Sequence, residues 1–319
     1  MENYLTTAVV LILISIIYLK LAEHFNIIDN PNNRSSHTIS TIRGGGVLFI
    51  AALWIFFYSS DFQYPYLVLG VTLISGISFI DDIKTLSSKM RLPFQFIAVF
   101  LVLFQVGIPF SPSYIFIIAM IIGVGFVNLY NFMDGVNGIT AAYSLGVLFG
   151  LYLVNGETHT INPDLIVYLC ISIIVFGYYN FRNKARFFAG DIGSISMAVI
   201  VFFMIFSFVH RFFAPVFILW VAVYSVDACL TIGYRKIIGE KIMEAHRLHI
   251  YQKIVDTYKT PHLVVSFSYA LLQFLIGWLV FKTYKLPLLL QVEIVCLVLL
   301  LLTALYVFLF YKTKQKKIS

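Results

Sequence analysis

Long apolar runs with almost no charged residues dominate this sequence and restrict its fold more than any other feature. About 20 apolar residues form a helix that crosses a bilayer. Eleven runs of roughly this length follow one another along the 319 residues, at approximately 4–22, 44–60, 66–80, 92–110, 113–131, 138–154, 164–181, 193–209, 212–232, 263–281 and 287–311. With 60% apolar and 12% charged residues, the chain is predicted to be an all-α polytopic membrane protein with eleven transmembrane helices, ten being the alternative count.

The positions of the basic residues predict how the chain is oriented. Lys and Arg accumulate in the cytoplasmic loops of inner-membrane proteins. If Met1 faces the periplasm, all of the 22 Lys and Arg residues except Arg211, Lys282 and Lys285 fall in cytoplasmic segments. We therefore expect a multi-pass protein of the bacterial inner membrane with a periplasmic N-terminus and a cytoplasmic C-terminus. The net charge of +7 then reflects topology and not nucleic-acid binding.

The loops contain no recognisable soluble domain, so residues 1–319 are expected to form a single integral-membrane domain. The expected cytoplasmic loops are about 23–43, 81–91, 132–137, 182–192 and 233–262. In the last of these, residues 233–241 are expected to extend the ninth span, and residues 243–254 to lie as an amphipathic helix on the membrane surface. Three cysteines within apolar runs are expected to be buried thiols: Cys170, Cys229 and Cys296.

Four short polar clusters interrupt the apolar runs. They are Asp81-Asp82, the sequence NFMDG at 131–135, the sequence GDIGS at 190–194 and the sequence HRLH at 246–249. Carboxylates are costly inside hydrocarbon and are tolerated at its edge. Acidic residues placed repeatedly at helix ends on one side of the membrane therefore predict a shared polar site on the cytoplasmic face.

The adjacent carboxylates Asp81 and Asp82 end the third span. Neighbouring residues on a helix point about 100° apart, so at least one of the two must face something polar. The pair suits magnesium coordination or the activation of a phosphate nucleophile. The alternative is a solvated pair balanced by Lys84 and Lys89.

Two further clusters contain candidate ligand-binding turns. In the sequence NFMDGVNG, Asn131, Asp134 and Asn137 supply amides and oxygens between flexible glycines, although Asp-Gly is also an ordinary turn signal. Asp191 lies where the eighth span begins, and the free amides of a helix N-terminus favour phosphate. A carboxylate there repels phosphate unless magnesium bridges them, so a metal ligand is the preferred role and a helix cap the alternative.

The last cluster places His246, Arg247 and His249 in a cytoplasmic loop. Arginine offers a planar fork of donors for phosphate oxygens, and histidine donates or accepts according to its protonation state. The cluster therefore suits a nucleotide diphosphate, whereas solvated charge is the alternative. Zinc is disfavoured because no Cys or further His nearby completes four ligands.

Together, the order and spacing of these clusters resemble the polyprenyl-phosphate N-acetylhexosamine-1-phosphate transferase superfamily over nearly the whole chain. The resemblance includes Asp29-x-Pro31, Arg34-x-x-His37, Arg43-Gly44-Gly45-Gly46, Asp81-Asp82, Lys89-x-Arg91, NFMDG, FFAGDIGS, Asp227 and HRLHIYQ. It implies transfer of an N-acetylhexosamine 1-phosphate from a UDP-N-acetylhexosamine to undecaprenyl phosphate, with release of UMP. It also implies a requirement for Mg²⁺, with Mn²⁺ as a substitute, contact with membrane lipids, and a homodimer as one candidate assembly.

The resemblance also implies roles for individual residues. Asp191 is expected to bind magnesium, and Asp81 or Asp82 to orient or deprotonate the lipid phosphate. Asp134 and His249 complete the expected catalytic set. The residues expected to contact substrate are His37, Arg43, Asn131, Asn137, Phe188, His246 and Arg247, with Phe188 stacking on uracil.

Two departures from the family pattern bear on the substrate. Asn137 stands where many relatives carry a second Asp, and His249-Ile250-Tyr251-Gln252 stands where several branches carry HxHH, which leaves one histidine of three. The HRxHxYQ form resembles the branch that initiates O-antigen or related glycans with 6-deoxy-N-acetylhexosamines. Phospho-N-acetylmuramoyl-pentapeptide transfer in peptidoglycan synthesis is the alternative. A secondary transporter is a further alternative of a different class, but transporter sites usually lie near the midplane of the membrane, whereas these clusters lie at helix ends.

Overall fold

The computed structural model describes residues 2–30, 40–84, 86–241 and 246–316. The elements are α1 (Glu2–His24), β1 (Ile28–Asp29), β2 (Thr41–Ile42), α2 (Val47–Ser59), α3 (Pro65–Ile83), α4 (Ser88–Val106), α5 (Ser113–Phe132), α6 (Ile139–Thr158), α7 (Pro163–Asn180), α8 (Gly190–Phe212), η1 (Pro215–Val221), α9 (Ala222–Ile237), α10 (Ile250–Tyr258), α11 (His262–Thr283) and α12 (Leu288–Lys316). Ten helices in the described ranges are long and apolar enough to cross a membrane, η1 and α9 counting as one, and α2 is a shorter apolar helix. The prediction of an all-α polytopic membrane protein is confirmed, with a helix at each of the eleven predicted runs.

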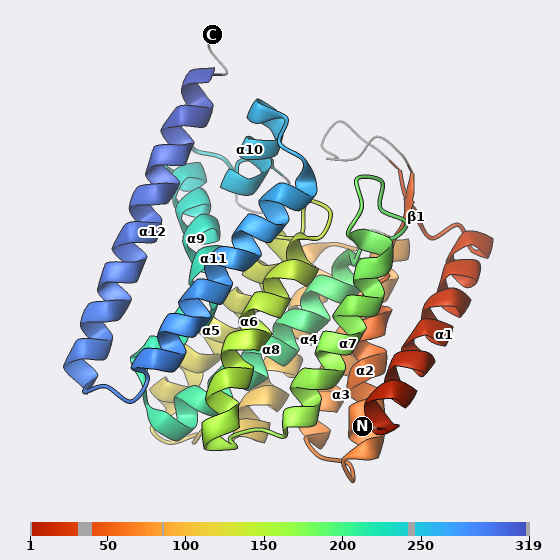
Figure 1. Ribbon diagram of the computed structural model, residues 1–319, viewed down its shortest axis with the longest axis horizontal. Helices are drawn as coiled ribbons and strands as arrows, with labels where there is room; N and C mark the ends of the chain where they lie inside the picture. Colours follow the sequence, from red (N-terminus) through yellow and green to blue (C-terminus); the bar gives the residue numbers. More distant parts are fainter. Residues whose placement is uncertain (1, 31–39, 85, 242–245, 317–319) are drawn as a thin grey trace.

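The helices alternate in direction, so every second connection lies at the same end of the bundle. Figure 1 shows β1, α10 and the C-terminus at one end and the N-terminus at the other. The end with α10 also carries the two-stranded antiparallel hairpin, in which Ile28 pairs with Ile42. All four polar clusters lie at this end, which we call the polar end.

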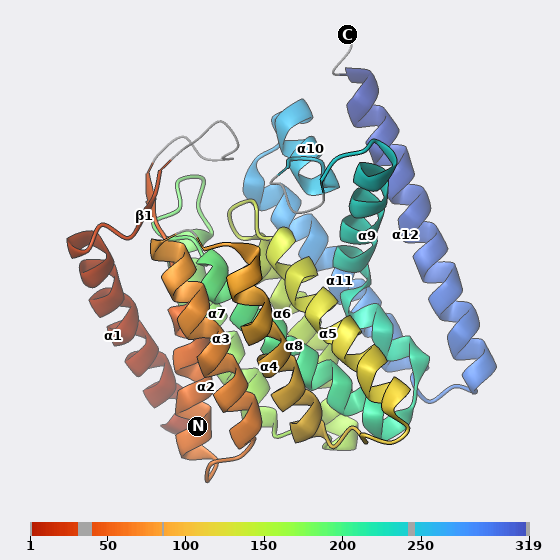
Figure 2. The same ribbon diagram turned by 180° about the vertical axis from the view of Figure 1, so that it is seen from behind.

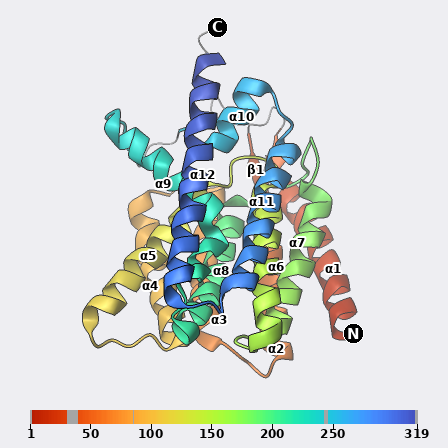
Figure 3. The same cartoon turned by 60° about the vertical axis from the view of Figure 1, so that its left-hand side comes forward.

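Helix α8 lies at the centre of the bundle, and α12 lies at its edge. In α8, 83% of the membrane-length window is buried, against 17% in α12. Figure 2 shows α3, α4 and α5 side by side in front of α8, and Figure 3 shows α12 standing along the outside. The large apolar side chains of α12, such as Leu300 and Leu301, are exposed. Exposed apolar surface of this extent on a membrane helix is suited to contact with lipid tails.

Glycines allow the polar ends of α2 and α8 to touch through their backbones. A Cβ atom on Gly46 would lie 2.0 Å from the Cα atom of Gly193, so no side chain fits between the two helices there. The backbone amide of Gly46 donates to the Ala189 carbonyl at 3.0 Å. Gly190 adopts a φ of +72°, a conformation that costs glycine little. This contact fixes the start of α8 against the start of α2.

The predicted boundaries in the last loop were partly wrong. Helix α9 ends at Ile237 and does not continue to Lys241, because Gly239 adopts a φ of +76° and the chain turns back. The amphipathic helix is α10, which spans Ile250–Tyr258 and not 243–254. His249 is its N-cap, and residues 242–245 lie outside the described residues.

The prediction of buried thiols was wrong for two of the three cysteines. Cys229 and Cys296 are exposed on the surfaces of α9 and α12, and Cys170 is half-buried. Apolar residues of a membrane protein can face lipid, so an apolar run does not imply burial in the protein core.

Candidate functional site

Five polar residues from four helix ends meet at the polar end. We call this group the acidic cluster: Asp81, Asp82, Arg91, Asn131 and Asp191. The two adjacent aspartates end α3, Arg91 lies in the first turn of α4, Asn131 ends α5 and Asp191 begins α8. The sequence therefore positions each residue through a helix terminus, where polar groups escape the hydrocarbon.

Arg91 joins two carboxylates of the acidic cluster. Its Nη1 atom donates to Asp81 Oδ2 at 2.8 Å and to Asp191 Oδ2. The carboxylates of Asp81 and Asp191 therefore both lie next to the positive charge of the Arg91 guanidinium. The side chains of Asp191 and Arg91 remain 23% and 22% exposed, so this region is open to small ions and to ligands.

Asp82 has a different environment from its neighbour. Its carboxylate accepts the backbone amides of Asp191 at 2.9 Å and Ile192 at 3.1 Å, and its side chain is only 1% exposed. It therefore caps the N-terminus of α8, with which a negative charge interacts favourably. Arg43 Nε lies 3.8 Å from Asp82 Oδ1 and 3.9 Å from the Asp29 carboxylate. Of the two adjacent aspartates, Asp81 is therefore the one that faces the Arg91 guanidinium.

Asn131 orients Asp191 within the cluster. Its Nδ2 atom donates to Asp191 Oδ1 at 3.1 Å and to the hydroxyl of Ser194 at 2.9 Å. Ser194 follows one turn after Asp191 on α8, so the two acceptors lie on the same face of that helix. The Asn131 side chain thus directs one oxygen of Asp191 and leaves the other to Arg91.

Asp134 lies beside the acidic cluster, in the turn between α5 and α6. The hydroxyl of Thr140 donates to its Oδ1 atom at 2.6 Å. Burial, opposed by the Thr140 hydrogen bond and assisted by the nearby carboxylate of Asp191, raises the pKa of Asp134 to about 6. A carboxyl group with this pKa changes its charge close to neutral pH, as acid and base catalysts do.

A second polar group lies where α9, α10 and α11 meet. We call it the His249 cluster: Asp227, Thr231, His249 and Tyr269. Asp227 Oδ1 lies 3.1 Å from His249 Nδ1 and accepts the backbone amide of Ile250 at 3.1 Å. Its other oxygen accepts the Tyr269 hydroxyl at 2.7 Å. Asp227 and His249 are 3% and 1% exposed, so this pair is enclosed by the protein.

Tyr251 connects the His249 cluster to the turn that carries Asp134. Its ring stacks on the ring of His249, with centroids 5.7 Å apart and planes 18° apart. Its hydroxyl donates to the backbone carbonyl of Phe132 at 3.1 Å. A Cβ atom on Gly135 would lie 2.2 Å from this hydroxyl, so glycine permits the contact. The two groups are therefore neighbours at the polar end.

The other two polar residues of the HRLH sequence, His246 and Arg247, contact the protein itself. Arg247 makes a bidentate ion pair with Asp256 of α10, at 2.7 and 3.0 Å. The His246 ring lies 4.9 Å from the His249 ring. Burial, with the nearby positive charges of His249 and Arg235, lowers the pKa of His246 to about 4. His246 is therefore neutral at physiological pH.

Asn137, His37 and Phe188 are not part of either cluster as described. The Asn137 side chain donates to the backbone carbonyls of Arg182 at 2.9 Å and Asn183 at 3.2 Å, so it supports the loop between α7 and α8. His37 lies outside the described residues. Phe188 is half-buried, and its backbone amide donates to the Ile42 carbonyl at 2.8 Å.

A hollow of about 500 Å³ lies beside the β hairpin at the polar end. Its lining residues are Leu19, Glu23, Ser40, Ile42, Ala185 and Arg186. This volume lies in the range of small-molecule pockets. Because Ile42 also binds the backbone of Phe188, the hollow borders the segment predicted to contact a nucleotide.

The acidic cluster offers hard oxygen donors for a divalent cation. Within the described ranges, no three His, Cys, Asp or Glu side chains converge as a complete metal site. Magnesium in proteins is usually held by one or two carboxylates together with phosphate oxygens and water. Asp81 and Asp191, which already share one cationic nitrogen, fit that pattern.

Several residues of these clusters have roles that the sequence alone does not indicate. Arg91 and Asp227 were visible as parts of motifs, but nothing in the sequence indicated their partners. Thr140, Ser194 and Tyr251 act through single hydrogen bonds that have no sequence signature.

Comparison with known proteins identifies related sequences. The model of glycosyl transferase family 4 matches residues 64–209, which include the whole acidic cluster. A putative glycosyltransferase of Methanocaldococcus jannaschii is 29% identical over 59% of this chain and 60% of its own length. A probable undecaprenyl-phosphate N-acetylglucosaminyl 1-phosphate transferase of Bacillus subtilis is 23% identical over 79% of this chain and 76% of its own.

A phospho-N-acetylmuramoyl-pentapeptide-transferase of Thermotoga maritima is 22% identical over 66% of this chain and 75% of its own length. The matched segment of this chain carries Asp81, Arg91, Asn131 and Asp191 on the helix ends described above, in a multi-pass membrane fold. These matches support the resemblance of the chain to glycosyl transferase family 4 and to polyprenyl-phosphate N-acetylhexosamine-1-phosphate transferases.

Proposed function

We propose that the protein transfers an N-acetylhexosamine 1-phosphate from a UDP-sugar to undecaprenyl phosphate and releases UMP. The observation that carries this proposal is the meeting of Asp81 and Asp191, from helices distant in sequence, on one nitrogen of Arg91 at the membrane edge. The site is thereby suited to a reaction between two phosphate-bearing substrates, one of which stays in the membrane. The excess of basic residues at this end supports placing the site on the cytoplasmic face of the bacterial inner membrane.

The proposed reaction is a displacement at phosphorus. An oxygen of the lipid phosphate attacks the phosphorus that carries the sugar, and the bond from that phosphorus to the UMP oxygen breaks. The products are undecaprenyl-diphospho-sugar and UMP. Both reactants are anions, so the site must offset their repulsion and the charge that develops on the leaving UMP.

Asp191 and Asp81 are the residues proposed to hold magnesium. When bound, the metal supplies positive charge to the phosphate oxygens of the donor. Arg91, which pairs with both carboxylates, is proposed to contact a phosphate oxygen of the substrates. Arg43, which lies beside Asp82, supplies a second cation at the same end.

Asp81 is the better candidate of the adjacent pair to act on the lipid phosphate. Asp82 is enclosed and caps α8, whereas Asp81 faces the partly exposed guanidinium of Arg91. Asn131 is proposed to orient Asp191, and Asp134 to act in its ionised form at the nucleotide-sugar site. Phe188 and Arg247 remain proposed contacts of uracil and of the diphosphate.

The identity of the sugar is the finer part of the proposal. The HRLHIYQ sequence supports a 6-deoxy-N-acetylhexosamine and the first step of O-antigen or related glycan synthesis. Phospho-N-acetylmuramoyl-pentapeptide transfer is the second candidate, because relatives with that name match two thirds of the chain. The position of both clusters at helix ends counts against a secondary transporter.

The test is UMP release by the purified protein with undecaprenyl phosphate and a panel of UDP-N-acetylhexosamines. The panel includes 6-deoxy sugars and UDP-N-acetylmuramoyl-pentapeptide. We expect release that depends on the lipid and stops when EDTA removes magnesium. A folded preparation that releases no UMP with any donor would contradict the proposal, and the preferred donor would distinguish the two candidates.

A further inference from the structure

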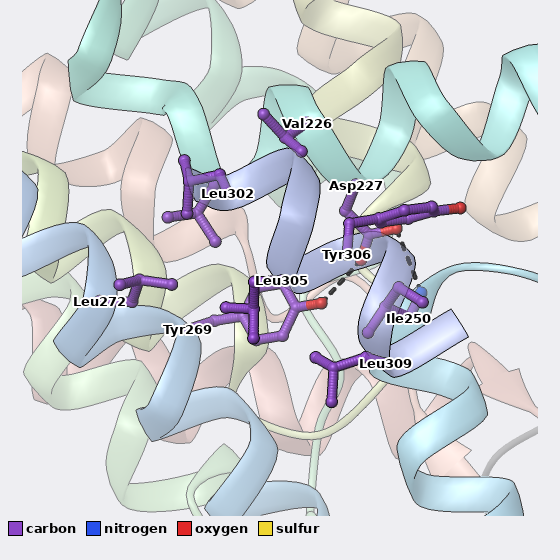
Figure 4. A pocket seen from close by; sticks show the side chains of 10 residues that line it. Val226, Asp227, Ile250, Tyr269, Leu272, Leu302, Leu305, Tyr306 and Leu309 are labelled. Atoms are coloured by element: carbon purple, nitrogen blue, oxygen red, sulfur yellow. Dashed lines mark hydrogen bonds between the residues drawn. The ribbon is translucent and has the colours of Figure 1, made fainter. Parts of the chain in front are cut away.

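A buried aspartate in a membrane-length helix requires an explanation, because ionised groups are rarely placed there without a function. Asp227 lies in α9, within the ninth span, and is 3% exposed. On one side it borders an apolar hollow whose lining includes Leu302 and Leu305 of α12, as Figure 4 shows. Water therefore contributes little to stabilising this carboxylate.

Four donors from three helices and a loop converge on Asp227. They are the side chains of Thr231, His249 and Tyr269 and the backbone amide of Ile250. In Figure 4, dashed lines join the Asp227 carboxylate to the Tyr269 hydroxyl and to the backbone nitrogen of Ile250. Because the oxygens of Asp227 are held by these partners, the carboxylate has a fixed orientation with respect to the His249 ring.

The two nitrogens of His249 have unequal surroundings. Nδ1 lies 3.1 Å from Asp227 Oδ1, whereas Nε2 is buried and has no hydrogen-bond partner among the described residues. Buried polar atoms without partners are uncommon and point to a role outside the resting fold. A carboxylate bound to one ring nitrogen determines which nitrogen carries the proton and how the ring is turned.

We propose that Asp227 is a positioning residue that acts through His249. The Asp227 carboxylate accepts Nδ1–H, and the ring thereby presents Nε2–H of its protonated form to a phosphate oxygen of the nucleotide sugar. This inference rests on the proposed function. It is supported by the contact of Tyr251 with both the His249 ring and the Phe132 carbonyl, which places the histidine beside the Asp134 turn. No proton is transferred in this role, since the imidazolium donates a hydrogen bond to the anion.

A double-mutant cycle on the full-length protein tests the inference. We expect Asp227→Asn to lower kcat for UMP release by roughly 10- to 100-fold, since a hydrogen bond to a charged group is lost. The KM for the UDP-sugar should change little, because the effect is on charge that develops during the reaction. In a His249→Ala background the same substitution should change kcat by no more than about twofold.

Asp164→Asn is the matched control, because it also replaces a carboxylate that accepts a tyrosine hydroxyl, that of Tyr4 at 2.6 Å, at the end of the bundle opposite the polar end. It should retain most of the wild-type kcat. Equal losses from Asp227→Asn in both backgrounds, or an equal loss in Asp164→Asn, would show that Asp227 has only a structural role and would overturn the inference. A wild-type protein that releases no UMP would instead overturn the proposed function, and this role with it.

A second measurement does not require a folded Asp227 variant. Nitrogen NMR of histidine-labelled wild-type protein in bilayers reports which ring nitrogen of His249 is protonated, and the His249→Ala variant assigns the signal. We expect Nδ1 to carry a proton. An unprotonated Nδ1 would overturn the inference without any measurement of activity.

Discussion

In the acidic cluster two carboxylates share one arginine nitrogen, whereas in the His249 cluster one carboxylate has four hydrogen-bond donors. The first arrangement is partly exposed and charged, so its members can exchange partners with ions and phosphates. The second is enclosed, and both oxygens of its carboxylate accept hydrogen bonds, so exchange at Asp227 would cost several of them. The comparison separates groups suited to bind a changing ligand from groups suited to hold a side chain in place.

The two clusters also differ in their relation to known sequences. The family model covers residues 64–209 and with them the acidic cluster, but Asp227 and His249 lie beyond the matched segment. The segment that resembles the family therefore includes α3, α4, α5 and α8. The ends of α9, α10 and α11 are where we expect residues that adapt the site to its own substrate.

Replacing Asp191 with Asn should produce the largest effect and would test whether the acidic cluster binds a metal. We expect a loss of UMP release of roughly 10³-fold, because the amide binds magnesium poorly. Asp61→Asn is the matched control, since Asp61 is exposed at the opposite end and adopts a φ of +52° that asparagine tolerates. Retained activity in Asp191→Asn would remove this residue from the metal role.

The adjacent aspartates should respond differently to the same substitution. Asp82→Asn should lower the free energy of unfolding by roughly 1–3 kcal/mol, because an amide replaces a carboxylate that accepts two backbone amides. Asp81→Asn should lose activity with a smaller loss of stability. Thermal unfolding and UMP release measured on both variants give the result, and equal melting temperatures would contradict the assignment of Asp82 as the cap of α8.

Replacing Arg247 tests whether this residue binds the substrate or only forms an ion pair within the protein. If it contacts the diphosphate, Arg247→Ala should raise the KM for the UDP-sugar about tenfold. Its ion pair with Asp256 is partly exposed, so stability should change by less than about 1 kcal/mol. Asp256→Asn, which breaks the pair and keeps the arginine, should leave KM near the wild-type value. An unchanged KM in Arg247→Ala would confine this residue to the protein surface.

The smallest expected effect is a decrease in kcat/KM at acidic pH. Burial raises the pKa of Asp134 to about 6, so its ionised form decreases as the pH falls through that value. If the ionised form is active, kcat/KM should fall to about half at pH 6 and to about a tenth at pH 5. Asp134→Asn should lack this decrease. Protonation of Asp134 itself favours the folded state, because its pKa is raised in that state, so the titration of this residue does not unfold the protein.

Much of the architecture could be predicted because hydropathy fixes the length and position of membrane helices. The placement of Asp191 at the start of α8, and of Asp81 and Asp82 at the end of α3, follows from the same pattern. The start of α10 could not be predicted, because it depends on contacts of His249 and Ile250 with Asp227, which lies 22 and 23 positions earlier in the chain.

The contacts that the site residues make within the protein could not be predicted from the sequence either. Adjacent residues of a helix point in different directions, but the sequence does not state which direction faces α8, so Asp81 and Asp82 could not be told apart. Likewise, Asn137 has the composition of a ligand-binding residue, and only the fold places the carbonyls of Arg182 and Asn183 against its amide.

The direct backbone contact between Gly46 and Gly193 limits which parts of the protein can move during turnover. Two helices that meet without intervening side chains cannot slide or tilt past each other by changing rotamers. The start of α8, and with it Asp191, is therefore stationary relative to α2. Any closure around a substrate must therefore come from other elements of the polar end.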